Sequence, residues 1–417
     1  MSSGFRRDML FSAGVTGASA AFNFLMQLLV MRLFGVAAYG AFSFWRNNVW
    51  LAGSIGRFGL QGLAFREVSV MQLTGSRAHL NSFLRMAVLV VLILGTVAAA
   101  ALLLADAASR EPKGDAWLFW LSSLLFAASI TANAVYRVLG SLRLSLVFDR
   151  LIQNPVFIAL VALMWWHGID DARALYAALA ISLAVITLLN IVGAWRSAAR
   201  STFPADATMP PPLWGPWLKS GWHLFLLAIG SIIGQRSTLL LAGLYLSSTD
   251  LGRFAFMATI AGLIALPLTA LNQVTAPALA RHKAAGEWSG VRHKIALTRN
   301  LGGLIGLVFA VGLLATYPIV ERLVGQPGLV DLTVFAILMV ATVLNAAFGP
   351  VAIGLSMIGE ERFAAAVLNG AVALKVIALL VVGPRYGMVG FALVEVGFML
   401  LWNGLMAFKL GQVLKIR

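Results

Sequence analysis

Three arginines lie inside apolar stretches of the sequence, where a charged side chain is costly. Arg236 interrupts the segment GSIIGQRSTLLLAG (residues 230–243), and Arg46 and Arg57 interrupt another apolar segment over residues 39–64. An arginine near the centre of a bilayer costs about 2.5–3.5 kcal/mol on insertion scales, so such residues usually face a wet cavity or a partner. Guanidinium groups bind phosphate oxygens in a fixed bidentate geometry and stay charged at any working pH. These three residues therefore predict a cationic cavity for an anionic ligand.

Arg46 and Arg57 are eleven residues apart, which places them on one helix face at about 16 Å separation. The alternative is that both side chains snorkel to opposite surfaces of the membrane. Snorkelling is the behaviour that we expect of the arginines near the ends of apolar segments, namely Arg32, Arg66, Arg137, Arg143 and Arg150.

Neutral polar side chains in the same segments could bind the hydroxyl groups of a ligand. Asn23 and Gln27 are four residues apart and share one helix face. The predicted ligand-binding set consists of the three arginines together with Asn23, Gln27, Asn47, Asn48, Gln235, Asn272 and Gln273.

Lys375 and Glu395 form a second group of charges inside apolar segments. They lie at similar predicted depth on two neighbouring antiparallel segments. One interpretation is a buried ion pair that joins two helices. The other is a protonatable Glu395 that couples transport to an ion gradient, with Lys375 as its partner.

The composition indicates the elements that must position these residues. Hydrophobic residues make up 60% of the 417 residues and charged residues only 11%, with a mean hydropathy of +0.89. A soluble core cannot absorb that much apolar surface, and segments of about 20 apolar residues can cross a bilayer as helices. We therefore predict an all-α polytopic membrane protein. Its twelve expected spans are 9–33, 39–64, 84–105, 116–139, 148–168, 172–195, 219–245, 251–280, 297–322, 330–356, 362–384 and 387–411.

The positions of lysine and arginine predict the orientation of these spans. With an internal N-terminus, the cytoplasmic segments hold thirteen lysines and arginines and the external loops hold three. By the positive-inside rule, both termini are expected in the cytoplasm. The net charge of +15 is dispersed between apolar segments rather than gathered in one domain, so a nucleic-acid partner is not expected.

The chain divides into two halves that look related. An offset of 212 residues aligns LFGVAAYGAFSF (33–44) with YLSSTDLGRFAF (245–256), so that Gly40 matches Gly252. The Pro- and Ala-rich linker lies between spans six and seven. We therefore expect a first six-helix lobe (1–197), a cytoplasmic linker (198–217) and a second six-helix lobe (218–417) around a central cavity, related as a parallel repeat.

These features are similar to those of the O-antigen flippase, or polysaccharide transporter, family of the multidrug/oligosaccharidyl-lipid/polysaccharide superfamily. The resemblance rests on the LFGVAAYG turn after a first span with Asn23 and Gln27, on the stretch from Gly59 to Arg66, and on the layout of two sets of six spans. One departure concerns span seven, where many relatives carry an acidic residue near the position of Thr238. That difference puts any inherited ion-coupling scheme in doubt.

The resemblance implies a flippase that moves a polyprenyl-diphosphate-linked oligosaccharide, an O-antigen or exopolysaccharide repeat unit, from the inner to the outer leaflet by alternating access. It implies the bacterial inner (cytoplasmic) membrane as the location. The expected partners are the lipid-linked oligosaccharide, membrane lipid, a glycan polymerase and other polysaccharide-assembly proteins. We expect the protein to be a monomer.

Motifs for other chemistry are missing from the sequence. The chain has no cysteine, no P-loop pattern and no metal-spaced histidine cluster, so we expect no metal, no cofactor and no enzymatic activity. Two alternatives stay open. A multidrug and toxic compound extrusion-type antiporter would need carboxylates in its cavity for cationic drugs, and a membrane-embedded glycan polymerase or ligase would need a catalytic external loop.

Overall fold

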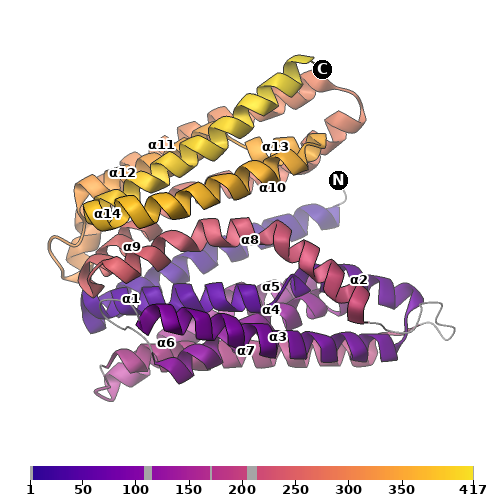
Figure 1. Cartoon of the computed structure of the whole chain (residues 1–417), viewed down its shortest axis with the longest axis horizontal. Coiled ribbons are helices and arrows are strands. Elements are labelled where there is room, and N and C mark those ends of the chain that lie inside the picture. The colour runs from indigo at the N-terminus through magenta and orange to yellow at the C-terminus, as the bar shows by residue number, and fades with distance from the viewer. Residues whose placement is uncertain (1–2, 108–114, 170, 204–213, 417) are drawn as a thin grey trace. The chain divides into compact units, whose positions relative to one another are not determined.

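The computed structural model of the chain describes residues 3–107, 115–169, 171–203 and 214–416 (Figure 1). All the regular elements in these stretches are helices, which confirms the predicted all-α class. The chain forms two compact units, unit 1 (residues 1–232) and unit 2 (233–417).

Unit 1 contains the helices of the first half of the chain and the start of α8. These are α1 (Ser3–Gly56), α2 (Leu60–Thr74), α3 (Arg77–Ala107), α4 (Ala116–Leu139), α5 (Leu142–Val147), the π-helix η1 (Phe148–Ile152), α6 (Gln153–Trp166), α7 (Ala172–Arg200) and part of α8 (Trp214–Tyr245). Within this unit α4 packs along α7 and against α3 (Figure 1).

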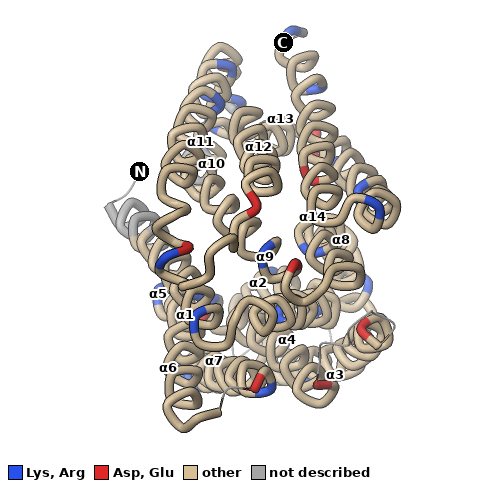
Figure 2. The backbone as a smooth tube through the Cα atoms, turned by 90° about the vertical axis from the view of Figure 1, so that its left-hand side faces the viewer, with Lys and Arg blue, Asp and Glu red and all other residues tan. Residues whose placement is uncertain are grey.

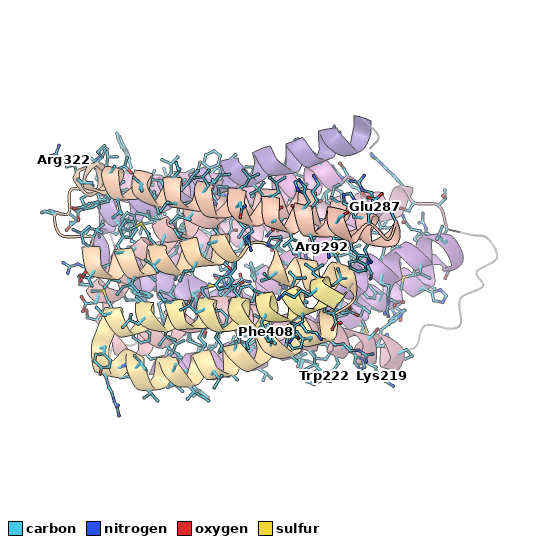
Figure 3. The ribbon with its side chains drawn as sticks, turned by 90° about the horizontal axis from the view of Figure 1, so that it is seen from above. Lys219, Trp222, Glu287, Arg292, Arg322 and Phe408 are labelled. Atoms are coloured by element: carbon cyan, nitrogen blue, oxygen red, sulfur yellow. The ribbon has the colours of Figure 1, made fainter. Side chains whose placement is uncertain are left out.

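Unit 2 contains the rest of α8 and the helices that follow it. These are α9 (Ser248–Gly262), the 3₁₀-helix η2 (Leu263–Ala265), α10 (Leu266–Ala284), α11 (Trp288–Val324), α12 (Leu332–Phe348), α13 (Val351–Ile358) and α14 (Glu361–Ile416). Here α12 packs against α11 and α14. Figure 3 shows α11 extending from Glu287 and Arg292 at one end to Arg322 at the other.

The described helices account for the predicted membrane spans. Nine of them are long and apolar enough to cross a membrane, and α8 adds a tenth when its two parts are taken as one span. Two long helices are each broken at a glycine: α1 at Gly35 (φ 84°) and α14 at Gly387 (φ 56°). Each of these helices covers two predicted spans, so the arrangement agrees with twelve.

Gly35 replaces the loop that the sequence predicted between the first two spans. Its backbone (φ 84°, ψ 168°) lies in a region that is essentially restricted to glycine. The helix resumes immediately afterwards and continues to Gly56. A single residue therefore turns the chain where we expected several.

The predicted second span (39–64) is wrong at its end. The helix stops at Gly56, and a tight turn through Arg57 and Phe58 leads into α2 at Leu60. Gly59 (φ 72°) has no room for a side chain, because an added Cβ would lie 2.5 Å from the carbonyl oxygen of Gly221 in α8. Hydropathy did not reveal this break because both sides of it are apolar.

Several helices begin at an aspartate that caps the free backbone N–H groups. The Asp115 carboxylate accepts from Leu118 N (3.2 Å) at the start of α4, and Asp331 accepts from Thr333 N (2.9 Å) at the start of α12. Asp115 also pairs with Arg173 near the start of α7 (3.2 Å). The Asp115 cap explains why the predicted start of the fourth span at residue 116 agrees with the start of α4.

The first part of α8 packs within unit 1. Trp217 packs edge-on against Phe83 of α3 (ring centroids 5.7 Å apart), and Phe225 stacks on Phe58 (5.6 Å). The helix bends by 47° between its parts Trp214–Leu226 and Ala228–Tyr245. The predicted lobe boundaries at 197 and 217 stay predictions, and residues 204–213 of the predicted linker lie outside the described residues.

Each unit joins its fourth and sixth predicted spans through a hydrogen bond between two asparagines. In unit 1 Asn133 Nδ2 donates to Asn190 Oδ1 (2.9 Å) between α4 and α7. In unit 2 Asn403 Nδ2 donates to Asn345 Oδ1 (3.1 Å) between α14 and α12. Asn345 follows Asn133 by the same 212 residues that align the two halves of the sequence. This shared contact supports the internal repeat.

Apolar side chains cover the outward faces of the long helices. Leu304 and Val308 on α11 are 60% and 61% exposed, and Phe408 on α14 is 69% exposed and points outward (Figure 3). Such faces are expected where lipid replaces water. Figure 2 shows lysine and arginine positions on α11 and α14 at the end of unit 2 that carries the C-terminus.

Candidate functional site

Arg46 lies midway along the second half of α1 with neutral partners. Its Nη2 donates to Asn23 Oδ1 (3.0 Å), its Nη1 lies 3.2 Å from the sulfur of Met26, and its guanidinium lies over the Trp50 ring (5.6 Å to the centroid). The side chain is half-buried. Asn23 and Arg46 are therefore in contact, as a shared binding function requires. The three partners of Arg46 are neutral, so they do not cancel its positive charge.

Gln27, Asn47 and Asn48 lie in the interior of unit 1. Gln27 is 2% exposed and accepts a hydrogen bond from the Tyr39 hydroxyl (2.5 Å). Asn47 and Asn48 are also buried, and Asn47 Nδ2 lies 3.5 Å from Asn48 Oδ1. These contacts stabilise the packing around α1, and a role in binding ligand hydroxyls stays a prediction.

Arg57 lies in the turn after α1 and belongs to a group of charges at one end of unit 1. Its Nη1 donates to Gln61 Oε1 (2.5 Å), and the Asp149 carboxylate acts on it electrostatically. Asp149 also pairs with Arg137 of α4 (3.3 Å) and interacts electrostatically with Arg150. We call Arg57, Arg137, Arg150 and Asp149 the arginine cluster. It contains three positive groups and one negative group.

The π-helix η1 positions two members of this cluster. Asp149 and Arg150 are adjacent within its five residues, and the helix packs against α1, α4 and α7. Asp149 faces Arg137, whereas Arg150 Nη1 donates to Thr16 Oγ1 of α1 (2.5 Å). Single-turn π-helices are rare and are frequent at functional sites.

The arginines that we expected to snorkel have different surroundings. Arg137 is only 20% exposed at its side chain and has an ion-pair partner, and Arg150 bonds to Thr16 inside unit 1. Arg66 is 56% exposed and pairs with Glu67 (2.6 Å). Arg137 and Arg150 thus have partners in unit 1 that the sequence does not reveal, and snorkelling stays a prediction for them.

Lys375 and Glu395 form an ion pair in unit 2. The distance from Lys375 Nζ to Glu395 Oε1 is 2.8 Å, and the lysine side chain is 1% exposed against 18% for the glutamate. Nζ also donates to the carbonyl oxygen of Gly234 (2.7 Å) and lies 4.6 Å from the centroid of the Phe398 ring. The Thr238 hydroxyl donates to the same Glu395 oxygen.

The contact between Thr238 and Glu395 concerns the position in span seven where this sequence lacks the acidic residue of many relatives. The position where many relatives carry an acid holds a threonine, but the threonine contacts a carboxylate from α14. A carboxylate therefore lies at this place in unit 2, supplied by another helix. The sequence could not reveal it, because the two residues are 157 positions apart.

The remaining predicted ligand-binding residues belong to α8 and α10. Arg236 is half-buried, and Gln235 is exposed. Asn272 Oδ1 is buried without a hydrogen-bond partner in the described part of the chain. The side chain of Gln273 lies outside the described residues. A substrate role for these four residues stays a prediction.

The described residues contain no group of three or more histidine, aspartate or glutamate side chains that could hold a metal ion. The charged sites of interest within these residues include the arginine cluster and Arg46 in unit 1 and the Lys375–Glu395 pair in unit 2. The chemistry that these sites can provide includes the binding of anions and the exchange of ions.

Solved structures of membrane transporters share this fold. The lipid II flippase MurJ, in an inward closed conformation, matches with a TM-score of 0.74 and 13% identity over 96% of this chain and 87% of that chain. An inward-facing multidrug resistance MATE family transporter of the MOP superfamily matches with a TM-score of 0.65 and 13% identity over 97% and 99%. A MOP superfamily transporter from Pyrococcus furiosus, titled for the reverse polarity of its binding pocket, matches with a TM-score of 0.59 and 15% identity over 98% and 94%.

The fold is therefore that of the MOP superfamily of transporters. The family model for polysaccharide biosynthesis proteins matches residues 5–283, which is more than half of the chain, so this chain belongs to that family. No curated protein sequence matches it. The protein is accordingly a multi-span membrane protein of the polysaccharide biosynthesis family.

Proposed function

We propose that this protein is a flippase for a polyprenyl-diphosphate-linked oligosaccharide, an O-antigen or exopolysaccharide repeat unit, which it moves from the inner to the outer leaflet. The observation that carries the proposal is Arg46. Its guanidinium lies midway along an apolar helix, and its partners there are an amide oxygen, a thioether and an indole ring. A charge kept in such surroundings usually marks a substrate pathway.

The charge of the pathway matches the proposed substrate. Arg46 and the arginine cluster together bring four guanidinium groups and one carboxylate into unit 1. Guanidinium groups bind diphosphate oxygens in bidentate geometry. We propose that Arg46, Arg57 and Arg236 hold the diphosphate in a cationic cavity, while Asn23 and the other predicted amides bind sugar hydroxyls and the lipid tail stays in the bilayer.

Alternating access is the proposed mechanism of movement. Solved structures with this fold include inward-facing and outward-facing conformations. In the bacterial inner membrane, an inside-negative potential favours outward movement of a negative head group by about 2.3 kcal/mol per charge per 100 mV. The products would then reach a glycan polymerase and other assembly proteins on the outer side.

Glu395 and Lys375 are the candidates for ion coupling. The pair is internally neutral, since Lys375 occupies the carboxylate that would bind a proton or another cation. We propose that coupling, if the protein uses it, requires this pair to open. A purely structural role for the pair is the competing hypothesis.

The test is deletion of the gene in its host, followed by complementation with variants. We expect deletion to leave intact lipid-linked repeat units on the cytoplasmic leaflet, measured by extraction and by their accessibility to an externally added glycosidase. Arg46→Ala and Arg236→Ala should fail to relieve this accumulation while inserting normally. Arg66→Ala, which changes an exposed arginine of unit 1, is the matched control and should complement. Normal surface glycan with both interior variants would refute the proposal.

A multidrug extrusion-type antiporter is the second candidate, because MATE family transporters have the same fold. Such a transporter would need free carboxylates for cationic drugs. The two carboxylates that lie within spans beside the candidate sites, Asp149 and Glu395, are both paired with cations. Loss of resistance to cationic dyes after deletion, with unchanged lipid-linked oligosaccharide, would favour this candidate.

A further inference from the structure

The arginine cluster contains more hydrogen-bond donors than its acceptors can use. Arg137 Nη2 donates to Asp149 Oδ2 at 3.3 Å, a long contact for a charged pair. The Nε of Arg137 is buried and has no hydrogen-bond partner within the described residues. Because a buried donor without an acceptor is costly, an unsatisfied guanidinium N–H in a native protein calls for an explanation.

The positions of the four residues suggest where a ligand would meet the cluster. Arg57 directly follows the end of α1, Arg137 lies two residues before the end of α4, and Asp149 and Arg150 lie near the start of the fifth predicted span. With the predicted orientation, all four lie toward the cytoplasmic side of unit 1. Arg46 lies eleven residues deeper along α1, so the cluster comes before Arg46 on an inward-to-outward path.

The charges of the cluster fit one class of ligand. Three guanidinium groups and one carboxylate leave a net charge of two positive units. A diphosphate diester, the form in which a polyprenyl lipid carries a sugar, has two negative charges and several acceptor oxygens. Asp149 is 34% exposed at its side chain, so it can leave Arg137 for water when another anion arrives.

Resting on the proposed function, we infer that the arginine cluster is the entry site for the diphosphate group, and that Asp149 is its internal counter-ion. In the absence of substrate the Asp149 carboxylate holds Arg137. When the substrate binds, its diphosphate replaces Asp149 and takes the donors of Arg137, Arg150 and Arg57. The returning carboxylate then competes with the diphosphate and promotes its movement toward Arg46.

We expect Asp149→Asn to raise the affinity for an anionic ligand rather than lower it. The substitution keeps the size of the side chain and removes the competing charge, so an anionic ligand should bind about tenfold more tightly, equivalent to ~1.4 kcal/mol. Flipping should become slower, because no carboxylate at position 149 then competes with the diphosphate and promotes its release from the cluster. A residue with a merely structural role would weaken binding when changed.

The experiment uses the full-length protein in lipid nanodiscs with farnesyl diphosphate as the probe, measured by isothermal titration calorimetry. Farnesol, which has the tail without the charge, measures binding by the tail alone. Arg137→Gln and Arg150→Gln should each weaken binding of farnesyl diphosphate about tenfold. Glu67→Gln removes the acid of a separate ion pair of unit 1, Arg66–Glu67, and is the matched control, with no expected change.

The outcomes separate this inference from the proposed function. Tighter binding by Asp149→Asn together with weaker binding by the two arginine variants supports the inference. Unchanged or weaker binding by Asp149→Asn, in a protein that still flips lipid-linked oligosaccharide, overturns the inference and leaves the proposed function intact. If the unaltered protein neither flips its substrate nor prefers farnesyl diphosphate to farnesol, the proposed function fails, and the inference fails with it.

Discussion

The ion pair between Lys375 and Glu395 should behave as a strongly coupled unit in a double-mutant cycle. Lys375→Met keeps an unbranched side chain against Phe398 but removes the ammonium from Glu395 and from the carbonyl of Gly234. Breaking a buried ion pair by removing one partner costs about 3–5 kcal/mol. Glu395 is 18% exposed and keeps the Thr238 hydroxyl, so we expect the lower end of that range, ~3 kcal/mol.

Glu395→Gln leaves Lys375 in place without its carboxylate partner. Lys375 is 1% exposed, so its ammonium cannot reach water and would lose its counter-charge. We expect this variant to be destabilised by about 3–5 kcal/mol. The double variant Lys375→Met/Glu395→Gln should lie within ~1 kcal/mol of the unaltered protein, because it leaves no uncompensated buried charge at this site.

The free energy of unfolding can be measured by reversible titration with sodium dodecyl sulfate in mixed micelles, followed by circular dichroism. The expected coupling energy between the two positions is at least ~3 kcal/mol. If the double variant is destabilised by the sum of the two single variants, the pair does not act as a unit and our description of its energetics is refuted.

The same double variant separates the two hypotheses for this pair. A stable double variant that still relieves the accumulation of lipid-linked oligosaccharide has only lost a structural contact. A stable double variant without transport indicates that the charges themselves serve transport, as ion coupling requires.

Two further predictions concern the scaffold of unit 1. Asn190→Leu should lower the free energy of unfolding by about 1–3 kcal/mol, because the fully buried Asn190 accepts from Asn133 and donates to Ser129 (3.1 Å); the same titration measures it, and an unchanged midpoint would contradict the prediction. Gly35→Ala should cost about 1–3 kcal/mol through its left-handed backbone alone, since no atom lies within 4 Å of an added Cβ. Gly17→Ala, at an equally open position within regular α1, is the control and should be neutral or slightly stabilising; equal effects at the two glycines would argue against the break.

The sequence by itself determined the class of the protein and much of its layout. Hydropathy is a local property, so the apolar segments could be found one at a time, and α4 begins and ends where its segment was predicted. The placement of Lys375 and Glu395 at similar depth followed from counting residues along two neighbouring spans. The offset of 212 residues matches Phe42 with Phe254, and both side chains are buried in the structure.

Only the tertiary structure decided which polar groups meet. Asp149 was not among the predicted site residues, although it pairs with Arg137 and interacts electrostatically with Arg150 and Arg57. Arg150 bonds to Thr16 across 134 positions of the chain. Such contacts depend on how each helix is rotated about its axis and on where it breaks, and neither property is fixed by mean hydropathy. The π-helix at Phe148–Ile152 changes that rotation locally, so the partners of its two charged residues could not be read from the spacing of the sequence.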